Sequence, residues 1–255
     1  MEKEKESVDG IILVLSCQKH SNTRLKEFKV PKPKLSNWKT IYVIGDFFLN
    51  ENYKLEDDRL TIKCEDSYIH FLKKLVLSIK YLNEIYKIKI GILRSGDDLL
   101  FNEQELEDFL KSSYKPDFYG FSPANMSLIN PNPQHLKIIK DDYFQISYYL
   151  QHPEDFKNPH HNLNNVDLIK YVKRPRLDVG VSGVLYYISN KCCTILVNHM
   201  ENINFNVFHF DEFSNSYPYT IEDCAVSFIL YYNKVDFIHS NIFKNVIAVH
   251  TNKYK

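Results

Sequence analysis

Residues 87–98 read KIKIGILRSGDD, a strand-like stretch that ends in two neighbouring carboxylates. Lys87 to Arg94 has the length and composition of a buried strand, and the chain then turns at Gly96-Asp97-Asp98. Carboxylates at such a turn can hold a hard divalent cation, because Mg²⁺ and Mn²⁺ prefer oxygen ligands and share them with substrate phosphates. An ordinary Gly-Asp turn without a ligand is the alternative.

Similar apolar runs occur on the N-terminal side of this segment. Ile11 to Cys17 (IILVLSC) and Thr40 to Asp46 (TIYVIGD) are typical of strands buried on both faces of a sheet, and Leu60 to Cys64 is a third strand candidate. From Ser67 to Tyr86 apolar residues recur at spacings of three and four, which predicts an amphipathic helix. A second helix is expected from about Asn102 to Leu110, with acidic residues near its start.

This alternation predicts an α/β fold with a central, mostly parallel sheet flanked by helices. Ligands of such sheets bind beyond the carboxyl ends of the strands, and Asp46 and Asp98 both fall at predicted ends. Strand character returns from Val181 to Ser189, and a helix is expected from Thr220 to Tyr232. The segments Pro116 to Pro133 and Gln151 to Asn165 are predicted to be loops that bind something or act as lids.

No repeat or linker divides the chain, so we expect a charged tail over residues 1–10 and a single domain over residues 11–255. Within that domain, residues 11–115 are expected to form a nucleotide-binding half and residues 116–255 an acceptor-binding half.

The composition of the 255 residues excludes several classes of protein. Apolar residues make up 44% and charged residues 25%, which excludes wholesale disorder and collagen-like or coiled-coil structure. The 32 basic residues equal the 32 acidic ones, so nucleic-acid binding is not expected. No apolar run approaches the roughly 20 residues of a membrane-spanning helix. Five cysteines without CxxC spacing predict reduced thiols and a cytoplasmic location.

Thr220-Ile221-Glu222-Asp223 fits the capping-box pattern, in which an acidic residue returns a hydrogen bond to the residue that caps the helix. A carboxylate at a helix start that opens on a cleft is equally well placed to act as a general base. The sequence leaves both interpretations open.

Polar and aromatic residues elsewhere give weaker signals. The basic stretch from Lys19 to Arg24 either meets a nucleotide diphosphate or is a solvated loop. His239 and His250 are each a buried, hydrogen-bonded imidazole or a metal ligand that completes the site of Asp98. The 35 phenylalanines and tyrosines suggest sugar-stacking platforms, although most must fill the core. Three histidines without zinc-ligand spacing are interpreted as parts of a solvated loop: His152, His160 and His161.

Five short motifs occur in order between about Ile11 and His250. They are Arg24 and Trp38 before YVIG (Tyr42 to Gly45), DSYIHFLKK (Asp66 to Lys74), GDDLLF (Gly96 to Phe101), VSGVLYYIS (Val181 to Ser189) and EDC (Glu222 to Cys224). Together they resemble the motifs of glycosyltransferase family 31, the group of β-1,3-galactosyltransferases, N-acetylglucosaminyltransferases and fringe proteins. The low arginine and high lysine and asparagine usage is similar to that of divergent members from giant DNA viruses.

The resemblance implies a GT-A-type nucleotide-sugar-binding fold and an inverting, metal-dependent transfer from a UDP-sugar to a hydroxyl of a glycan or glycoprotein. It implies that Asp98 and His250 bind Mn²⁺ or Mg²⁺, with His250 preferred over His239 as the histidine ligand. It implies that Asp223 and Glu222 are catalytic residues, with Asp223 as the general base. The donor-binding residues that it implies are Arg24, Asp66, Lys74 and Asp97.

Two departures from the family pattern stand out. Gly96 replaces the first aspartate of the family's DDD triplet, and the family's secretory anchor and lumenal disulfides are not expected in this protein. A catalytically inactive carbohydrate- or nucleotide-binding relative is therefore one alternative. An interaction protein whose carboxylate motifs are only a turn and a cap is another.

Overall fold

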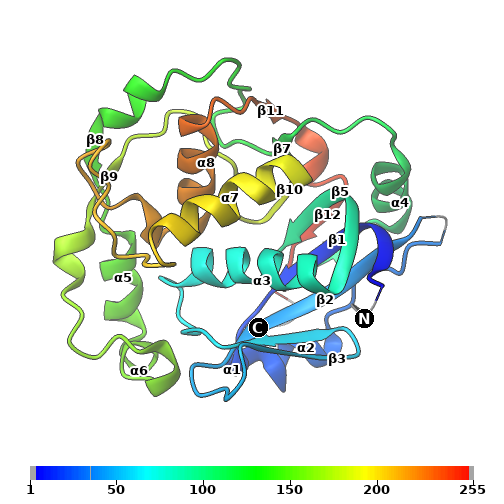
Figure 1. Cartoon of the computed structure of the whole chain (residues 1–255), viewed down its shortest axis with the longest axis horizontal. Coiled ribbons are helices and arrows are strands. Elements are labelled where there is room, and N and C mark those ends of the chain that lie inside the picture. The colour runs from blue at the N-terminus through cyan, green and yellow to red at the C-terminus, as the bar shows by residue number, and fades with distance from the viewer. Residues whose placement is uncertain (1–3, 35, 253–255) are drawn as a thin grey trace.

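A sheet of eight strands crosses the described part of the chain, residues 4–34 and 36–252 of a computed structural model (Figure 1). From one edge to the other, its strands are β11 (Phe237–His239), β7 (Phe118–Gly120), β10 (Leu185–Ser189), β5 (Tyr86–Ser95), β1 (Glu6–Leu15), β2 (Trp38–Gly45), β4 (Arg59–Ile62) and β3 (Tyr53–Glu56). β1 is parallel to β2 and β5, and β2 is parallel to β4. β10 is antiparallel to both of its neighbours. The predicted α/β fold with a mostly parallel sheet flanked by helices is confirmed.

Both faces of β1 are buried, as its continuous apolar run predicts. Ile11, Leu13 and Leu15 pack in one core with α3 (Phe71–Ile85), α7 (Asn190–Asn202) and α8 (Glu222–Tyr232). Ile12 and Val14 pack in a second core with α2 (Arg24–Glu27) and α4 (Glu103–Lys111). Because the side chains of a strand alternate between its two faces, one apolar run serves both layers. The layers enclose the sheet (Figure 1).

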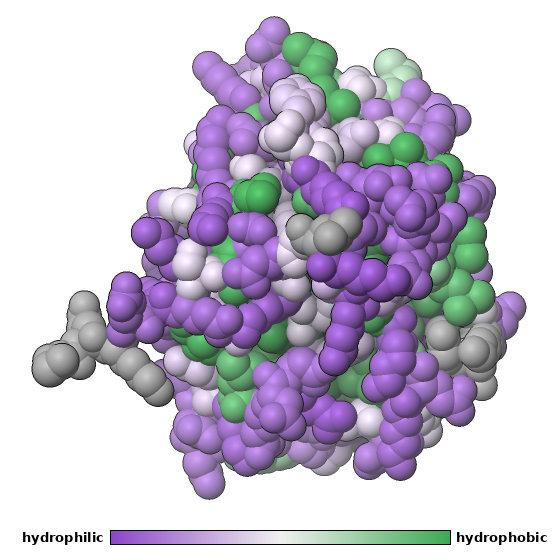
Figure 2. Space-filling model, turned by 90° about the vertical axis from the view of Figure 1, so that its right-hand side faces the viewer, coloured by the Kyte–Doolittle hydropathy of each residue, from purple (hydrophilic) through white to green (hydrophobic). Residues whose placement is uncertain are grey.

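The surface is mainly polar on the face that Figure 2 shows, where hydrophobic residues occupy small separate areas. Within the described ranges, none of the helices has the length and apolar character that crossing a membrane requires. None of the five cysteines is in a disulfide.

The boundaries of the N-terminal elements differ from the expected ones. β1 begins at Glu6, inside the predicted tail, because Glu6 and Ser7 pair with Tyr86 and Lys87 of β5. β3 was not predicted; it is an edge strand with alternating exposure and lacks a continuous apolar run. Residues 1–3 of the predicted tail lie outside the described residues.

The predicted loops contain short regular elements. β7 lies inside the first loop, and the second loop contains α6 (Pro153–Phe156) and the 3₁₀ helix η2 (Pro159–His161). These elements are too short to produce a periodic pattern in the sequence. Such a pattern needs at least one full stretch of alternating or helically spaced apolar residues.

The capping-box interpretation of Thr220 is wrong. The N-cap residue of α8 is Ile221, and no side chain caps this helix. The Thr220 Oγ1 instead accepts hydrogen bonds from the buried Arg174, at 3.1 Å from Nε and 2.9 Å from Nη2. A buried guanidinium must have its donors paired, and this requirement takes the hydroxyl away from the helix. Glu222 and Asp223 are thereby free for other partners.

A buried ion pair ties the carboxyl ends of β1 and β2 to α3. Lys74 is fully buried, and its Nζ donates to Asp66 Oδ1 at 2.5 Å and to the carbonyl oxygen of Ser16 at 2.7 Å. Asp66 also accepts hydrogen bonds from the backbone N–H groups of Gly45 and Gln18, at 2.9 and 2.6 Å. Burial alone would lower the pKa of Lys74, but Asp66, Cys64 and Cys17 together outweigh it, with Asp66 contributing most, and the pKa is raised. The ammonium therefore stays charged.

We predict that Lys74→Met lowers the free energy of unfolding by about 3–5 kcal/mol, because it leaves the Asp66 carboxylate buried without its cation. Lys80→Met is the control on the same helix. The ion pair of Lys80 with Glu201 is accessible to solvent, so its loss should cost at most about 1 kcal/mol. Urea denaturation followed by circular dichroism measures both values. Equal losses in the two variants would contradict the role given to Lys74.

Candidate active site

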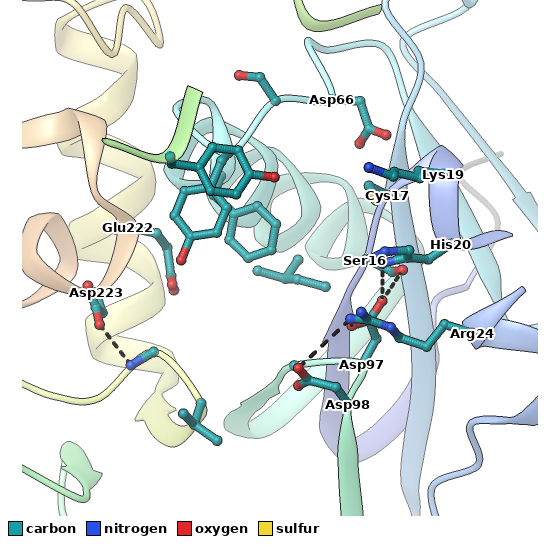
Figure 3. A pocket seen from close by; sticks show the side chains of 18 of the residues that line it. Ser16, Cys17, Lys19, His20, Arg24, Asp66, Asp97, Asp98, Glu222 and Asp223 are labelled. Carbon is teal, nitrogen blue, oxygen red and sulfur yellow. Dashed lines mark hydrogen bonds and ion pairs between the residues drawn. The ribbon is translucent and has the colours of Figure 1, made fainter. Parts of the chain in front are cut away.

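A cavity of about 420 Å³ opens at the carboxyl ends of β1 and β5 (Figure 3). Its walls come from the segment after β1, the turn after β5, the loop before β10 and the start of α8. Seven of the eight predicted site residues line it: Arg24, Asp66, Asp97, Asp98, Glu222, Asp223 and His250. Residues that are distant in the sequence therefore meet at one place, beyond the strand ends where ligands of parallel sheets bind.

Lys74 is the eighth predicted residue, and it does not line this cavity. Its ammonium is fully buried against Asp66, so it does not face a ligand. The expected role of Lys74 as a phosphate-binding cation is wrong, because the family-like motif here supplies an internal ion pair. Asp46 ends β2 as predicted, but its carboxylate accepts from the backbone of Phe48 and lies 3.4 Å from His160, outside the cavity.

Asp97 is saturated by partners from the segment after β1. Its Oδ2 accepts from Ser16 Oγ at 2.5 Å and from His20 Nδ1 at 3.1 Å, and its Oδ1 accepts from Arg24 Nη1 at 2.6 Å. Burial alone would raise the pKa of this carboxyl, but the three hydrogen bonds outweigh burial and bring the pKa to about 2. The hydrogen bond with Asp97, followed by one with Cys17, raises the pKa of His20 to about 9. His20 is therefore a cation at neutral pH.

Asp98 keeps its carboxylate accessible at the cavity. Its Oδ2 lies 3.6 Å from His250 Nδ1 and 3.8 Å from Arg24 Nη1. β12 (Ala248–His250) brings His250 there, because it pairs with β6 (Leu99–Phe101) in a register that places His250 opposite Leu99. His239 is elsewhere, with its Nδ1 accepting from the Ser122 backbone N–H.

The chemistry of Asp98 and His250 fits a divalent cation. Two metal–ligand bonds of about 2.1 Å span at most about 4.2 Å, so one ion can bridge atoms 3.6 Å apart. Oxygen and imidazole nitrogen are suitable donors for Mn²⁺ or Mg²⁺, and phosphate oxygens and water commonly complete the shell. Asp97 is a poor ligand because its oxygens are already occupied.

Asp223 lies on the opposite side of the cavity from Asp98 (Figure 3). Its Oδ2 accepts from the Gly183 backbone N–H at 2.9 Å, and its Oδ1 accepts from that of Cys224 at 2.8 Å. Glycine allows this approach, since a Cβ at Gly183 would lie 3.0 Å from Asp223 Oδ2. The same loop reaches the Asp98 turn, because the Gly96 N–H donates to the Val184 carbonyl at 2.9 Å.

Glu222 belongs to a buried network beside Asp223. It accepts from Arg94 Nη2 at 2.8 Å and from the Tyr186 hydroxyl, and Arg94 also donates to the Gly183 carbonyl. Burial raises the pKa of Glu222, partly opposed by Arg94. With both oxygens in use, Glu222 positions the Gly183 loop and hence Asp223.

Ser16 and Arg94 were not predicted as site residues, and His20 was included only within the basic stretch from Lys19 to Arg24. Ser16 and His20 follow the end of β1, so the strand-end argument that selected Asp98 applies to them as well. The signal for Arg94 is a charged residue that directly follows the uncharged residues 90–93 in a strand expected to be buried. Among the predicted loop histidines, His161 is buried and lines the cavity, so its assignment to a solvated loop is wrong.

His152, Glu154 and Asp155 form a cluster next to Lys19. The atoms of this cluster that could bind a metal lie within 4.8 Å of one another. Lys19 Nζ is 3.3 Å from Asp155 Oδ1, and the Tyr148 hydroxyl donates to Asp155 Oδ2 at 2.9 Å. The Lys19 ammonium therefore already offsets part of the negative charge of this cluster.

Comparisons with known proteins add little to this geometry. No protein-family model and no curated protein matches the chain. One similar solved structure is the inositol-1-phosphate CTP transferase from T. maritima, with 11% sequence identity, a TM-score of 0.41, and coverage of 98% of this chain and 91% of that one. Functional argument therefore rests on the site itself.

We predict that His20 titrates near pH 9 and that Asp97→Asn moves its midpoint toward the ordinary value of 6.5. The folded-state pKa exceeds the unfolded one, so the stabilisation is complete below about pH 6.5 and is lost as the pH rises through about 9. NMR titration of the imidazole measures the midpoint, and urea denaturation across this range measures the stability. Midpoints near 6.5 in both proteins would overturn the assignment.

Proposed function

We propose that the protein is a glycosyltransferase that moves a sugar from a UDP-sugar to an acceptor hydroxyl with inversion of configuration. The observation that carries this proposal is the meeting of Asp98 and Asp223 in one cavity, on opposite sides and joined by one loop (Figure 3). Asp98, which can bind a metal together with His250, and Asp223 across the cavity suit a displacement reaction in which a diphosphate leaves and an alcohol attacks.

The donor diphosphate would lie along the segment after β1. Arg24 and the protonated His20 provide positive charge there, and Ser16 orients Asp97, which holds both cations in place. Asp98 and His250 would hold Mn²⁺ or Mg²⁺, which when bound neutralises negative charge on the departing diphosphate. Cations that are already in position before the reaction stabilise the developing negative charge without any rearrangement of the protein.

Asp223 would accept the proton of the acceptor hydroxyl. As that proton leaves, the acceptor oxygen forms a bond to the anomeric carbon, and the bond between this carbon and the diphosphate oxygen breaks. The electron pair of the broken bond leaves with UDP. Attack from the side opposite the diphosphate inverts the anomeric centre. The Gly183 N–H holds Asp223 Oδ2, and the network of Arg94 and Glu222 positions that loop.

The order of the motifs supports membership of glycosyltransferase family 31 as part of this proposal. Gly96 stands where the family has an aspartate, and Asp97 is saturated, so the metal would depend on Asp98 and His250. A nucleotide-binding protein without transferase activity is the second candidate. Asp97 already accepts three hydrogen bonds, so Asp98 is the one carboxylate of this turn left to bind a metal, and this favours the second candidate.

Asp223→Asn tests the catalytic base. We expect UDP release from UDP-galactose, UDP-glucose and UDP-N-acetylglucosamine, with Mn²⁺ and methyl β-glycoside acceptors, to fall by about 10²- to 10⁴-fold. UDP affinity by calorimetry should stay unchanged, because Asp223 lies away from the diphosphate-binding segment. The exposed Asp178→Asn is the control and should retain activity. Full activity of Asp223→Asn would exclude it as the base, and a wild type that binds UDP without turnover would favour the second candidate.

Asp98→Ala tests the metal site. Mn²⁺ should strengthen UDP binding to the wild type, and this enhancement should disappear in the variant, because the carboxylate ligand is gone. Asp46→Ala is the matched control, since Asp46 also follows a strand end but lies outside the cavity. Calorimetric titration of UDP with Mn²⁺ and with EDTA measures the difference. An unchanged Mn²⁺ effect in Asp98→Ala would place the metal elsewhere.

A further inference from the structure

Three aromatic side chains form one wall of the cavity: Tyr68, Phe71 and Tyr148. We call this set the aromatic wall. The Tyr68 ring stacks on Phe71 with centroids 5.8 Å apart and an interplanar angle of 17°, and on Tyr148 at 5.3 Å and 28°. Asp223 and Arg24 line the same cavity as the wall.

Tyr68 remains open to solvent although three rings pack on it, those of Phe71, Phe144 and Tyr148. It is 41% exposed, and no hydrogen bond to its hydroxyl is found among the residues that the structure describes. A tyrosine that only filled the core would be buried and its hydroxyl paired. Its exposed surface and free hydroxyl are therefore available to a ligand in the cavity.

The wall is held rigidly from behind. The Tyr148 hydroxyl donates to Asp155 Oδ2 at 2.9 Å, and Asp155 is also paired with Lys19. Phe71 begins α3 and packs under the Arg94 guanidinium, whose central carbon lies 5.5 Å from the ring centroid. A surface whose side chains are already ordered loses little conformational entropy when it binds a ligand.

Tyr68 lines the same cavity as Asp223 and Glu222. Burial is the main cause that raises the pKa of Tyr68; the charges of Asp223 and Glu222 raise it further, and the charge of Asp98 contributes less. The cations suited to a diphosphate are held by Asp97 at the other side, after β1. A ring resting on Tyr68 would thus be next to the proposed base.

We propose that the aromatic wall binds the acceptor as a pyranose ring, with Tyr68 as the principal contact; this inference rests on the proposed function. A pyranose has an apolar C–H face that packs on an aromatic surface and peripheral hydroxyls that can hydrogen-bond to Tyr68 Oη. The wall offers this combination of an apolar body and a polar tip. One hydroxyl of a sugar held there faces Asp223, which selects the oxygen that attacks.

Saturation-transfer difference NMR tests the proposal with the full chain, Mn²⁺ and UDP. The probes are methyl β-glycosides of galactose, glucose and N-acetylglucosamine. We expect signals from the ring protons of at least one glycoside, and binding about tenfold weaker in Tyr68→Ala. Tyr68→Phe should keep most of the ring-proton signal, because the aromatic face remains. Tyr114→Ala is the control, since Tyr114 is 77% exposed and lies outside the cavity.

Calorimetry of UDP with the same variants separates this inference from the proposed function. Unchanged UDP affinity in Tyr68→Ala, together with the loss of glycoside binding, supports an acceptor site. A comparable loss of UDP affinity would assign the wall to the nucleobase and overturn the inference, as would the absence of any Tyr68-dependent glycoside signal. Glycoside binding without UDP binding to the wild type would contradict the proposed donor and leave a carbohydrate site.

Discussion

The cavity depends on the buried pair of Lys74 and Asp66. Removing two charges from water is costly, and this cost is compensated only when every partner is in place. Here Asp66 holds the backbone N–H groups of Gly45 and Gln18, and Lys74 holds the carbonyl of Ser16. The pair thus joins the ends of β1 and β2 to α3. The segment that carries Ser16 and His20 starts at this end of β1. This part of the cavity is therefore rigid, because moving any one of these groups would break the hydrogen bonds of the others.

A single loop connects the two sides of the cavity. Val184 accepts from the Gly96 N–H of the Asp98 turn, while Gly183 donates to Asp223. The buried Arg94 binds both the Gly183 carbonyl and Glu222, so the carboxylate proposed as base is oriented by a charge pair in the wall of the cavity. In a displacement reaction small errors in position are costly, and such support from behind keeps the attacking and leaving groups in line.

Several sequence predictions failed where tertiary contacts outweighed local patterns. Thr220 fits a capping box, but Arg174, 46 residues away, donates to its hydroxyl. Lys74 fits a phosphate-binding role, but Asp66, eight residues before it in the same motif, holds it inside the protein. His161 is expected in a solvated loop, yet it is buried at the cavity. The partner of Thr220 and the burial of Lys74 and His161 depend on packing in three dimensions, which local patterns do not contain.

The continuous apolar runs were sufficient to predict the strands β1 and β2, because a strand buried on both faces needs apolar side chains throughout. β5 was predicted although Lys87 and Lys89 are exposed, because its second half is buried and largely apolar. The alternation of these strands with helical segments predicted the α/β class. The same strand ends pointed to Asp97 and Asp98. Only the tertiary structure decided that Asp97 is saturated while Asp98 stays accessible beside His250, and that Asp223 faces the same cavity. The physical reason is that the apolar pattern of a strand or helix is formed by residues that are neighbours in the sequence. The partners of a charged group are determined instead by the order of the strands and by the loops that cross the sheet edge.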